Sequence, residues 1–188
     1  VVPGPIDSIE VEPSDGTVVA GETLTLAATA HDAFGNRVPR DLFQWQLGEG
    51  DSAPRVEAEE VEFLDQKVGT TLVTARAGGV AGSTHVEVVP AELDRFAVTP
   101  RSISAASGDG VQVTIEGVDR FGNTVQVNPS VTTEPEALGT HDPQAGHWTA
   151  AAEGEGFLRI QQGATESTIT LTVTPGSPVR LEIQGLEE

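Results

Sequence analysis

The residues best suited to chemistry in this sequence are oxygen-bearing side chains in two copies of one short motif. Asp32-Ala33-Phe34-Gly35-Asn36 and Asp119-Arg120-Phe121-Gly122-Asn123 each place a carboxylate and an amide four residues apart. Hard oxygen ligands of this kind suit Ca²⁺, and we consider four of them as candidate metal ligands: Asp32, Asn36, Asp119 and Asn123.

The same motif has a structural interpretation, which we favour. An Asp side chain accepts hydrogen bonds from nearby backbone N–H groups, and Gly-Asn suits the left-handed conformations of a tight turn. We therefore expect no cofactor. Calcium is the one ion for which the sequence offers candidate ligands. The predicted structural turn residues are Asp32, Phe34, Gly35, Asn36, Asp119, Phe121, Gly122 and Asn123.

Two tryptophans are the other candidates for a site. Trp45 lies in the run Phe43-Gln44-Trp45-Gln46-Leu47, and Trp148 lies in His147-Trp148-Thr149. We expect both rings to pack in the core or at its edge. The alternative is that they are exposed and stack on sugars, which would make Trp45 and Trp148 carbohydrate contacts.

Motifs for catalysis are missing from the sequence. There is no Cys, no His-Glu-x-x-His and no Gly-x-Ser-x-Gly nucleophile elbow, and the glycine pairs do not lead into helices that could hold a phosphate. Carboxylates are so frequent that adjacent pairs carry no information. We therefore predict that the protein is not an enzyme.

The charge balance excludes further classes of partner. The 188 residues contain 29 Asp and Glu against 10 Lys and Arg, for a formal net charge of −19. Nucleic-acid binding needs clustered basic residues, so we expect none. No run approaches the roughly 18 apolar residues of a membrane-spanning helix, so we expect no membrane insertion.

The elements that would hold the two motifs are predicted to be β-strands. Residues 22–30, 84–88 and 167–173 alternate apolar and polar side chains with a period of two and are rich in Val, Ile and Thr. Turn pairs such as Asp15-Gly16 and Gly78-Gly79 separate such runs. Short strands between frequent turns predict an all-β protein of antiparallel sandwiches.

The chain also contains an internal sequence repeat. The offset between Asp32 and Asp119 is 87 residues, and the same offset relates Pro13 to Pro100 and Gly69 to Gly156. We predict one sandwich module over residues 1–89 and a second over 90–174. Residues 175–188 repeat the opening pattern again, which predicts the first strand of a further module or a tail.

The alternating strand followed by Asp-x-Phe-Gly-Asn-x-Val resembles the bacterial Ig-like domains of the invasin and intimin type. The later stretches 68–75 with 82–88, and 156–160 with 167–173, resemble the family's last hairpin. The resemblance implies two tandem Ig-like antiparallel β-sandwiches. It also implies an extracellular or cell-surface location, because members of the family are mostly spacers that hold a neighbouring domain away from a surface.

We therefore expect a non-enzymatic structural segment of a larger surface or secreted protein. Its predicted partners are the neighbouring domains of the same polypeptide, with a polysaccharide or another surface protein as further candidates. The family's adhesive role is not transferred, since this chain contains no adhesive or lectin-like domain. The alternative function is a carbohydrate-binding accessory module of a secreted hydrolase.

Overall fold

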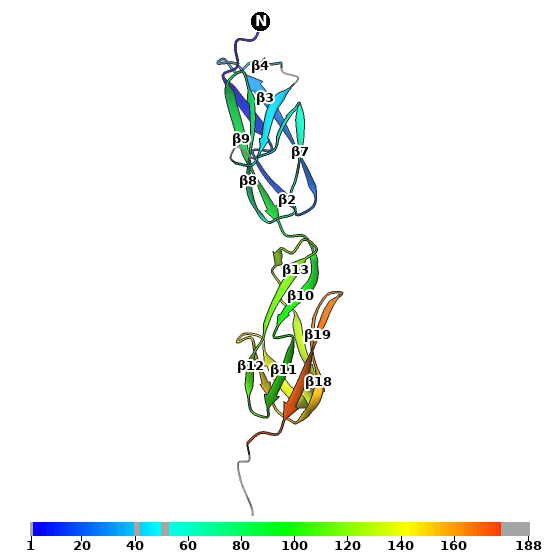
Figure 1. The fold of residues 1–188 in the computed structure, drawn as a ribbon. Helices are drawn as coiled ribbons and strands as arrows, with labels where there is room; N and C mark the ends of the chain where they lie inside the picture. The colour runs from blue at the N-terminus through cyan, green and yellow to red at the C-terminus, as the bar shows by residue number, and fades with distance from the viewer. Residues whose placement is uncertain (1, 40–41, 50–52, 178–188) are drawn as a thin grey trace, which may run out of the picture. The chain divides into compact units, whose positions relative to one another are not determined.

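The computed structural model describes residues 2–39, 42–49 and 53–177, and nearly all of its regular structure is β-strand (Figure 1). Among these residues there is no α-helix, and one 3₁₀ turn, η1 (Glu136–Leu138), interrupts the strands. The contacts divide the chain into two compact units. The first comprises Val1–Ala91 with Phe121–Asn123, and the second Glu92–Arg120 with Thr124–Glu188. We call them the first and second module and describe each by itself.

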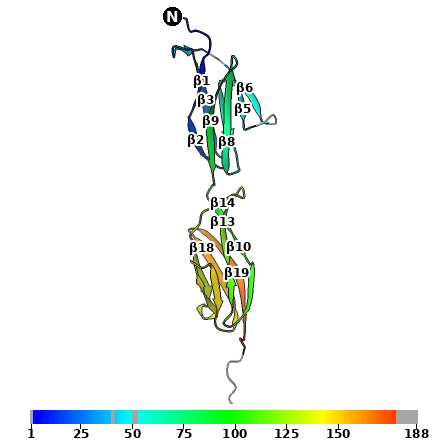
Figure 2. The same ribbon diagram turned by 90° about the vertical axis from the view of Figure 1, so that its left-hand side faces the viewer.

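The first module is a sandwich of two sheets (Figure 2). One sheet is built on β3 (Thr23–His31), which pairs with β1 (Ser8–Glu12), β4 (Arg37–Val38) and β7 (Glu60–Leu64). The other has the strand order β2 (Asp15–Val19), β9 (Val80–Val89), β8 (Gly69–Ala77), β5 (Phe43–Leu47) and β6 (Arg55–Ala58).

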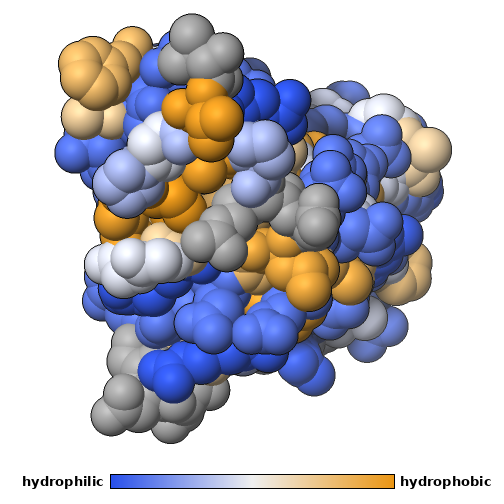
Figure 3. Space-filling view, turned by 90° about the horizontal axis from the view of Figure 1, so that it is seen from above, coloured by the Kyte–Doolittle hydropathy of each residue, from blue (hydrophilic) through white to orange (hydrophobic). Residues whose placement is uncertain are grey.

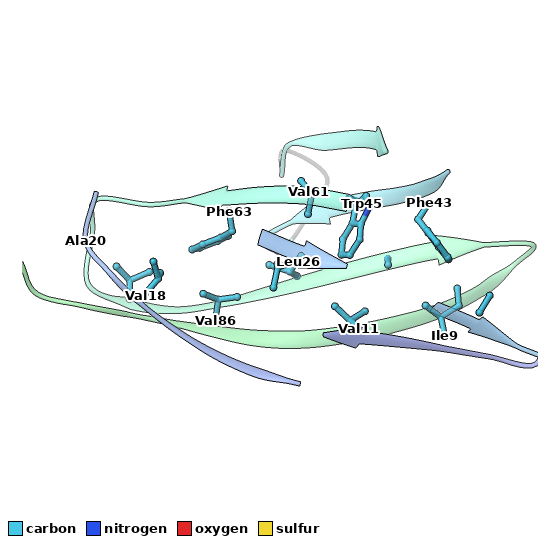
Figure 4. Packing of buried hydrophobic residues seen from close by; sticks show 14 residues of the cluster. Ile9, Val11, Val18, Ala20, Leu26, Phe43, Trp45, Val61, Phe63 and Val86 are labelled. Carbon is cyan, nitrogen blue, oxygen red and sulfur yellow. The ribbon is translucent and has the colours of Figure 1, made fainter. Parts of the chain in front are cut away.

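Alternation along the strands builds the core of the first module. β1, β2 and β9 bury every second residue, as expected for sheets with one face in the core and one in solvent. Figure 4 shows the inward side chains of both sheets meeting between the layers. The buried cluster comprises Ile9, Val11, Val18, Ala20, Leu26, Ala30, Phe43, Trp45, Val61, Phe63, Val73, Ala75, Val86 and Val88.

The second module repeats this plan with its own core. One sheet has the order β10 (Leu93–Thr99), β13 (Thr114–Asp119) and β14 (Thr124–Val125). A four-stranded sheet has the order β11 (Ser102–Ala106), β19 (Thr165–Thr174), β18 (Gly154–Gln162) and β15 (Ser130–Glu134). A small third sheet has the order β12 (Gly110–Gln112), β17 (His147–Ala150) and β16 (Gly139–Asp142).

The all-β architecture of Ig-like, mainly antiparallel sandwiches is confirmed, and each module also contains one parallel strand pair. β2 pairs with β9 in parallel, from Asp15 opposite His85 to Val19 opposite Val89. β11 pairs with β19 in parallel in the second module. The reason is that the opening segment is split. Its first half pairs within one sheet, and its second half crosses to the other sheet and runs alongside the last strand.

The chain enters and leaves the first module at opposite ends of the sandwich. At the entry end, the backbone N–H of Asp7 donates to the His31 carbonyl, and at the exit end the N–H of Ala20 donates to the Val89 carbonyl. Between these ends lies the nine-residue strand β3, which spans about 30 Å. The third-module strand predicted from residues 175–188 lies almost entirely outside the described residues.

Candidate functional site

The first copy of the repeated motif forms a closed hydrogen-bonded turn after β3. The Asp32 side chain is only 4% exposed. Its Oδ1 accepts hydrogen bonds from the backbone N–H groups of Phe34 (3.0 Å) and Asn36 (2.9 Å), and its Oδ2 accepts one from Gly4 (2.9 Å). The Asn36 amide Nδ2 donates to both oxygens, at 3.2 Å and 3.0 Å. The carboxylate therefore connects the turn to the segment that precedes β1.

These donors also set the charge state of the motif. The Gly4 N–H, then the Asn36 side chain and the other backbone donors, lower the pKa of Asp32 from 3.8 to about 2, against a smaller opposing effect of burial. Gly35 supports the turn with a φ of 78°, a left-handed conformation that favours glycine. Asp32 is thus a fixed, ionised acceptor over almost the whole accessible pH range.

This geometry does not fit a calcium site at Asp32 and Asn36. Both carboxylate oxygens already accept N–H donors, and Asn36 presents its amide nitrogen, not its oxygen, to the carboxylate. A Ca²⁺ ligand set needs several converging oxygens with free lone pairs. In the described part of the chain, no group of three or more His, Cys, Asp or Glu side chains is arranged to hold a metal ion.

The second copy differs in its surroundings. Asp119 is fully buried, and Gly122 has a φ of 90°, so the turn geometry repeats. Phe121 and Asn123 are half-buried. Phe34, at the matching position of the first copy, is 90% exposed. Identical motif residues therefore have different environments, which a sequence repeat alone does not reveal.

Both tryptophan rings pack in a core, as expected, so the structure does not support the alternative in which Trp45 and Trp148 stack on sugars. Both side chains are 0% exposed. Trp45 lies edge-on to Phe43 and donates its indole N–H to the Ala58 carbonyl at 3.1 Å. Trp148 donates to the Thr133 hydroxyl at 3.0 Å. Each indole satisfies its only donor inside its own module and serves as a core residue.

The polar face of β5 was not predicted from the sequence. Gln44 and Gln46 flank the buried Trp45 and point to the opposite side of the sheet, where they line a cavity of about 480 Å³ with Arg55, Glu57 and Arg76. The signal was present in the alternation Phe-Gln-Trp-Gln-Leu. The alternation does not show which strands lie beside β5, because that depends on long-range strand pairing.

Large apolar side chains on the surface are scattered among polar ones. Figure 3 shows one end of the molecule, where hydrophilic residues surround small apolar areas. Single exposed apolar side chains of this kind are normal on protein surfaces. Among the described residues the exposed large hydrophobic side chains are Val2, Phe34, Leu42, Val56, Leu64, Val68 and Phe157. None of the helical structure in the described ranges is long and apolar enough to cross a membrane.

The fold and the buried turn motifs define a class: tandem Ig-like β-sandwich modules. No family model matches the sequence. A solved structure of FdeC, an Escherichia coli adhesin, aligns with 94% of this chain and 67% of its own at a TM-score of 0.64 and 22% identity. The S-layer protein rSbsC(31-844) aligns with 95% of this chain and 29% of its own at a TM-score of 0.50 and 20% identity.

One curated protein is similar over most of the chain. It is ice-binding protein 1 of Shewanella frigidimarina (strain NCIMB 400), which is 24% identical over 170 residues. The match covers 90% of this chain but only 19% of that protein. The chain thus spans about a fifth of the length of this relative. By their names, these similar proteins are an adhesin, a surface-layer protein and an ice-binding protein.

Proposed function

We propose that this chain is a non-enzymatic, extracellular structural segment that sets the spacing of a neighbouring domain in a larger surface or secreted protein. The observation that carries the proposal is the path of the chain through each module. The first module is entered at the Asp32 end and left at the Val89 end. In the second module, the Ser107 N–H donates to the Thr174 carbonyl at the exit end, where β11 and β19 finish.

Such a path suits a segment that transmits tension. When the two ends of a module are pulled apart, β2 is drawn toward its N-terminus and β9 toward its C-terminus. Because these strands are parallel, the force acts along the strands and loads the hydrogen bonds of the five register pairs together. β11 and β19 form the same arrangement with five pairs. Names of surface proteins among the similar proteins support the extracellular location.

Stretching a single molecule from its two termini tests the proposal. We expect two separate unfolding events, each releasing about 250–300 Å of contour length, as expected for roughly 85 residues of extended chain. A single event for the whole chain, or a gradual extension without peaks, would contradict it.

A matched control uses the absence of cysteine, which makes introduced thiols unique handles. The double variant D15C/H85C places both handles on exposed residues at the same end of the parallel pair. Pulling there peels β2 from β9 one bond at a time, so the first module should open at a clearly lower force than from its termini. Equal forces in the two geometries would remove the mechanical argument.

A further inference from the structure

The second module contains a buried histidine nitrogen that no hydrogen bond satisfies. His141 lies on β16, and its Nε2 atom is buried without a hydrogen-bond partner among the residues that the structure describes. Such an atom is uncommon in folded proteins, because nothing replaces the hydration that it loses. A neutral imidazole carries one N–H, whereas a protonated ring carries an N–H on both nitrogens. The burial of Nε2 therefore matters most when the ring takes up a proton.

His141 lies beside a mainly apolar cavity of the second module. The cavity has a volume of about 320 Å³, and its wall includes Val113, Ile115, Val127 and Val131. These four side chains belong to the core of the module or pack against it. Among the described residues of the lining, His141 is the only one that titrates. The described wall therefore offers no carboxylate that could stabilise a protonated ring.

The charged groups around β16 do not compensate for this. Burial lowers the pKa of His141 below its ordinary value of 6.5, and the charge of Asp142 opposes this with a smaller effect. Asp142 is exposed and accepts backbone N–H bonds from Gln144 and Ala145. The other titratable side chains on the neighbouring elements are His147 on β17, Glu134 on β15, Glu116 on β13 and Glu136 on η1. The three glutamates are exposed, and Glu134 is bound by Arg159.

The strand that carries His141 also covers the core tryptophan of the module. β16 has four residues and is the edge strand of the small third sheet, where it pairs with β17. In this pairing His141 lies directly opposite Trp148. A Cβ added at Gly139 would lie 2.6 Å from Cζ2 of Trp148, so the backbone of β16 lies directly against the indole. Movement of β16 away from β17 would therefore expose a side chain that is 0% exposed in the folded module.

From this geometry we propose that protonation of His141 acts as an acid switch, which releases β16 from β17 and uncovers Trp148. The protonated ring carries an N–H on the buried Nε2 and must reach water to satisfy it, and the edge strand is the element that can move. Because the fold favours the neutral ring, its contribution to stability is complete above the ordinary pKa of 6.5 and is lost as the pH falls below that value and through the pKa of the folded state. The switch does not depend on the proposed spacing role.

Urea denaturation of the full chain at about pH 7.5 and about pH 5.5, followed by the backbone amide signals in NMR, tests the switch. This window lies above the range in which carboxyl groups usually titrate. We expect the urea midpoint of the second module to fall at the lower pH. The midpoint of the first module should change less in the same sample, because its described part contains no buried imidazole nitrogen without a partner. At low urea, the amide signals of β16 and the indole N–H signal of Trp148 should be the first in the second module to lose intensity.

Two variants remove the titrating ring. H141L should give the second module the same midpoint at both pH values, because an apolar side chain suits the cavity wall, and H141Q provides the same comparison if H141L does not fold. The matched control H85Q removes an exposed imidazole from β9 of the first module and should retain the fall. An equal fall in H141L or H141Q would overturn the proposal, as would a constant midpoint in the unmodified protein. Signal loss that begins away from β16 would overturn the assignment of β16 as the element that moves.

Discussion

The most informative residue in this chain is Asp32, because one carboxylate connects a turn, the entering segment and an amide side chain. Its role could be predicted as a turn cap, since Asp followed by Gly-Asn favours that geometry. The bond to Gly4 could not be predicted, because Gly4 lies 28 residues away and meets Asp32 only when β1 pairs with β3. The same contacts argue against a calcium site at Asp32. They could not be predicted from the spacing of the residues in the motif.

The first prediction concerns the charge of Asp32. Because its pKa is lowered to about 2, the ionised form stabilises the fold above the ordinary value near 3.8, and this stabilisation is lost as the pH falls toward 2. D32N should therefore lower the urea midpoint at pH 7, and the difference from the unmodified protein should shrink between pH 4 and pH 2. The control E10Q, at an exposed position on β1, should change the midpoint little at either pH. A D32N deficit that persists undiminished at pH 2 would refute the assignment.

The second prediction concerns the partner of the buried indole in the second module. T133V removes the hydroxyl that accepts the Trp148 N–H and leaves a buried donor unsatisfied. It should lower the free energy of unfolding by about 1–3 kcal/mol. T132V changes the neighbouring exposed threonine of β15 and should have an effect within about 0.5 kcal/mol. Chemical denaturation of both variants provides the comparison, and equal stabilities would show that the hydrogen bond contributes little.

At the scale of elements, the crossing of the opening segment between sheets matters most. Alternation predicted the strands 22–30, 84–88 and 167–173 well, because each has one face in a core. It could not predict the parallel pairs β2–β9 and β11–β19, since period-two patterns look the same in both orientations. Nor could it predict which side chains lie beside the polar face of β5, because these come from β6 and β8, up to about 30 residues away in the sequence.

The third prediction concerns the close approach of β1 to β9. A Cβ added at Gly82 would lie 2.2 Å from the Ile9 carbonyl oxygen, so G82A must push the two strands apart. Overpacking of this kind typically costs about 1–3 kcal/mol. The control G4A adds a methyl group that meets Asp32 at an ordinary 3.6 Å and should be nearly neutral. Denaturation monitored by NMR should show G82A lowering the unfolding midpoint of the first module. Unaltered stability would mean that β1 and β9 can separate without loss.

At the scale of the whole molecule, each module closes its own hydrophobic core. The buried cluster of the first module and that of the second share no buried residue. The 87-residue repeat predicted two such units because both copies keep the turn, the Gly positions and the strand pattern. It did not predict that the boundary between the two units would be discontinuous in the sequence, with Phe121–Asn123 assigned to the first unit.

The burial of one tryptophan in each core has a spectroscopic consequence. The chain contains two Trp and no Tyr, so its near-ultraviolet fluorescence comes almost entirely from two fully buried indoles. W45F leaves an emitter in the second module only, and W148F leaves one in the first. Each module therefore carries its own built-in optical reporter. The red shift on exposure to water lets the unfolding of either module be timed in the intact chain without any attached label.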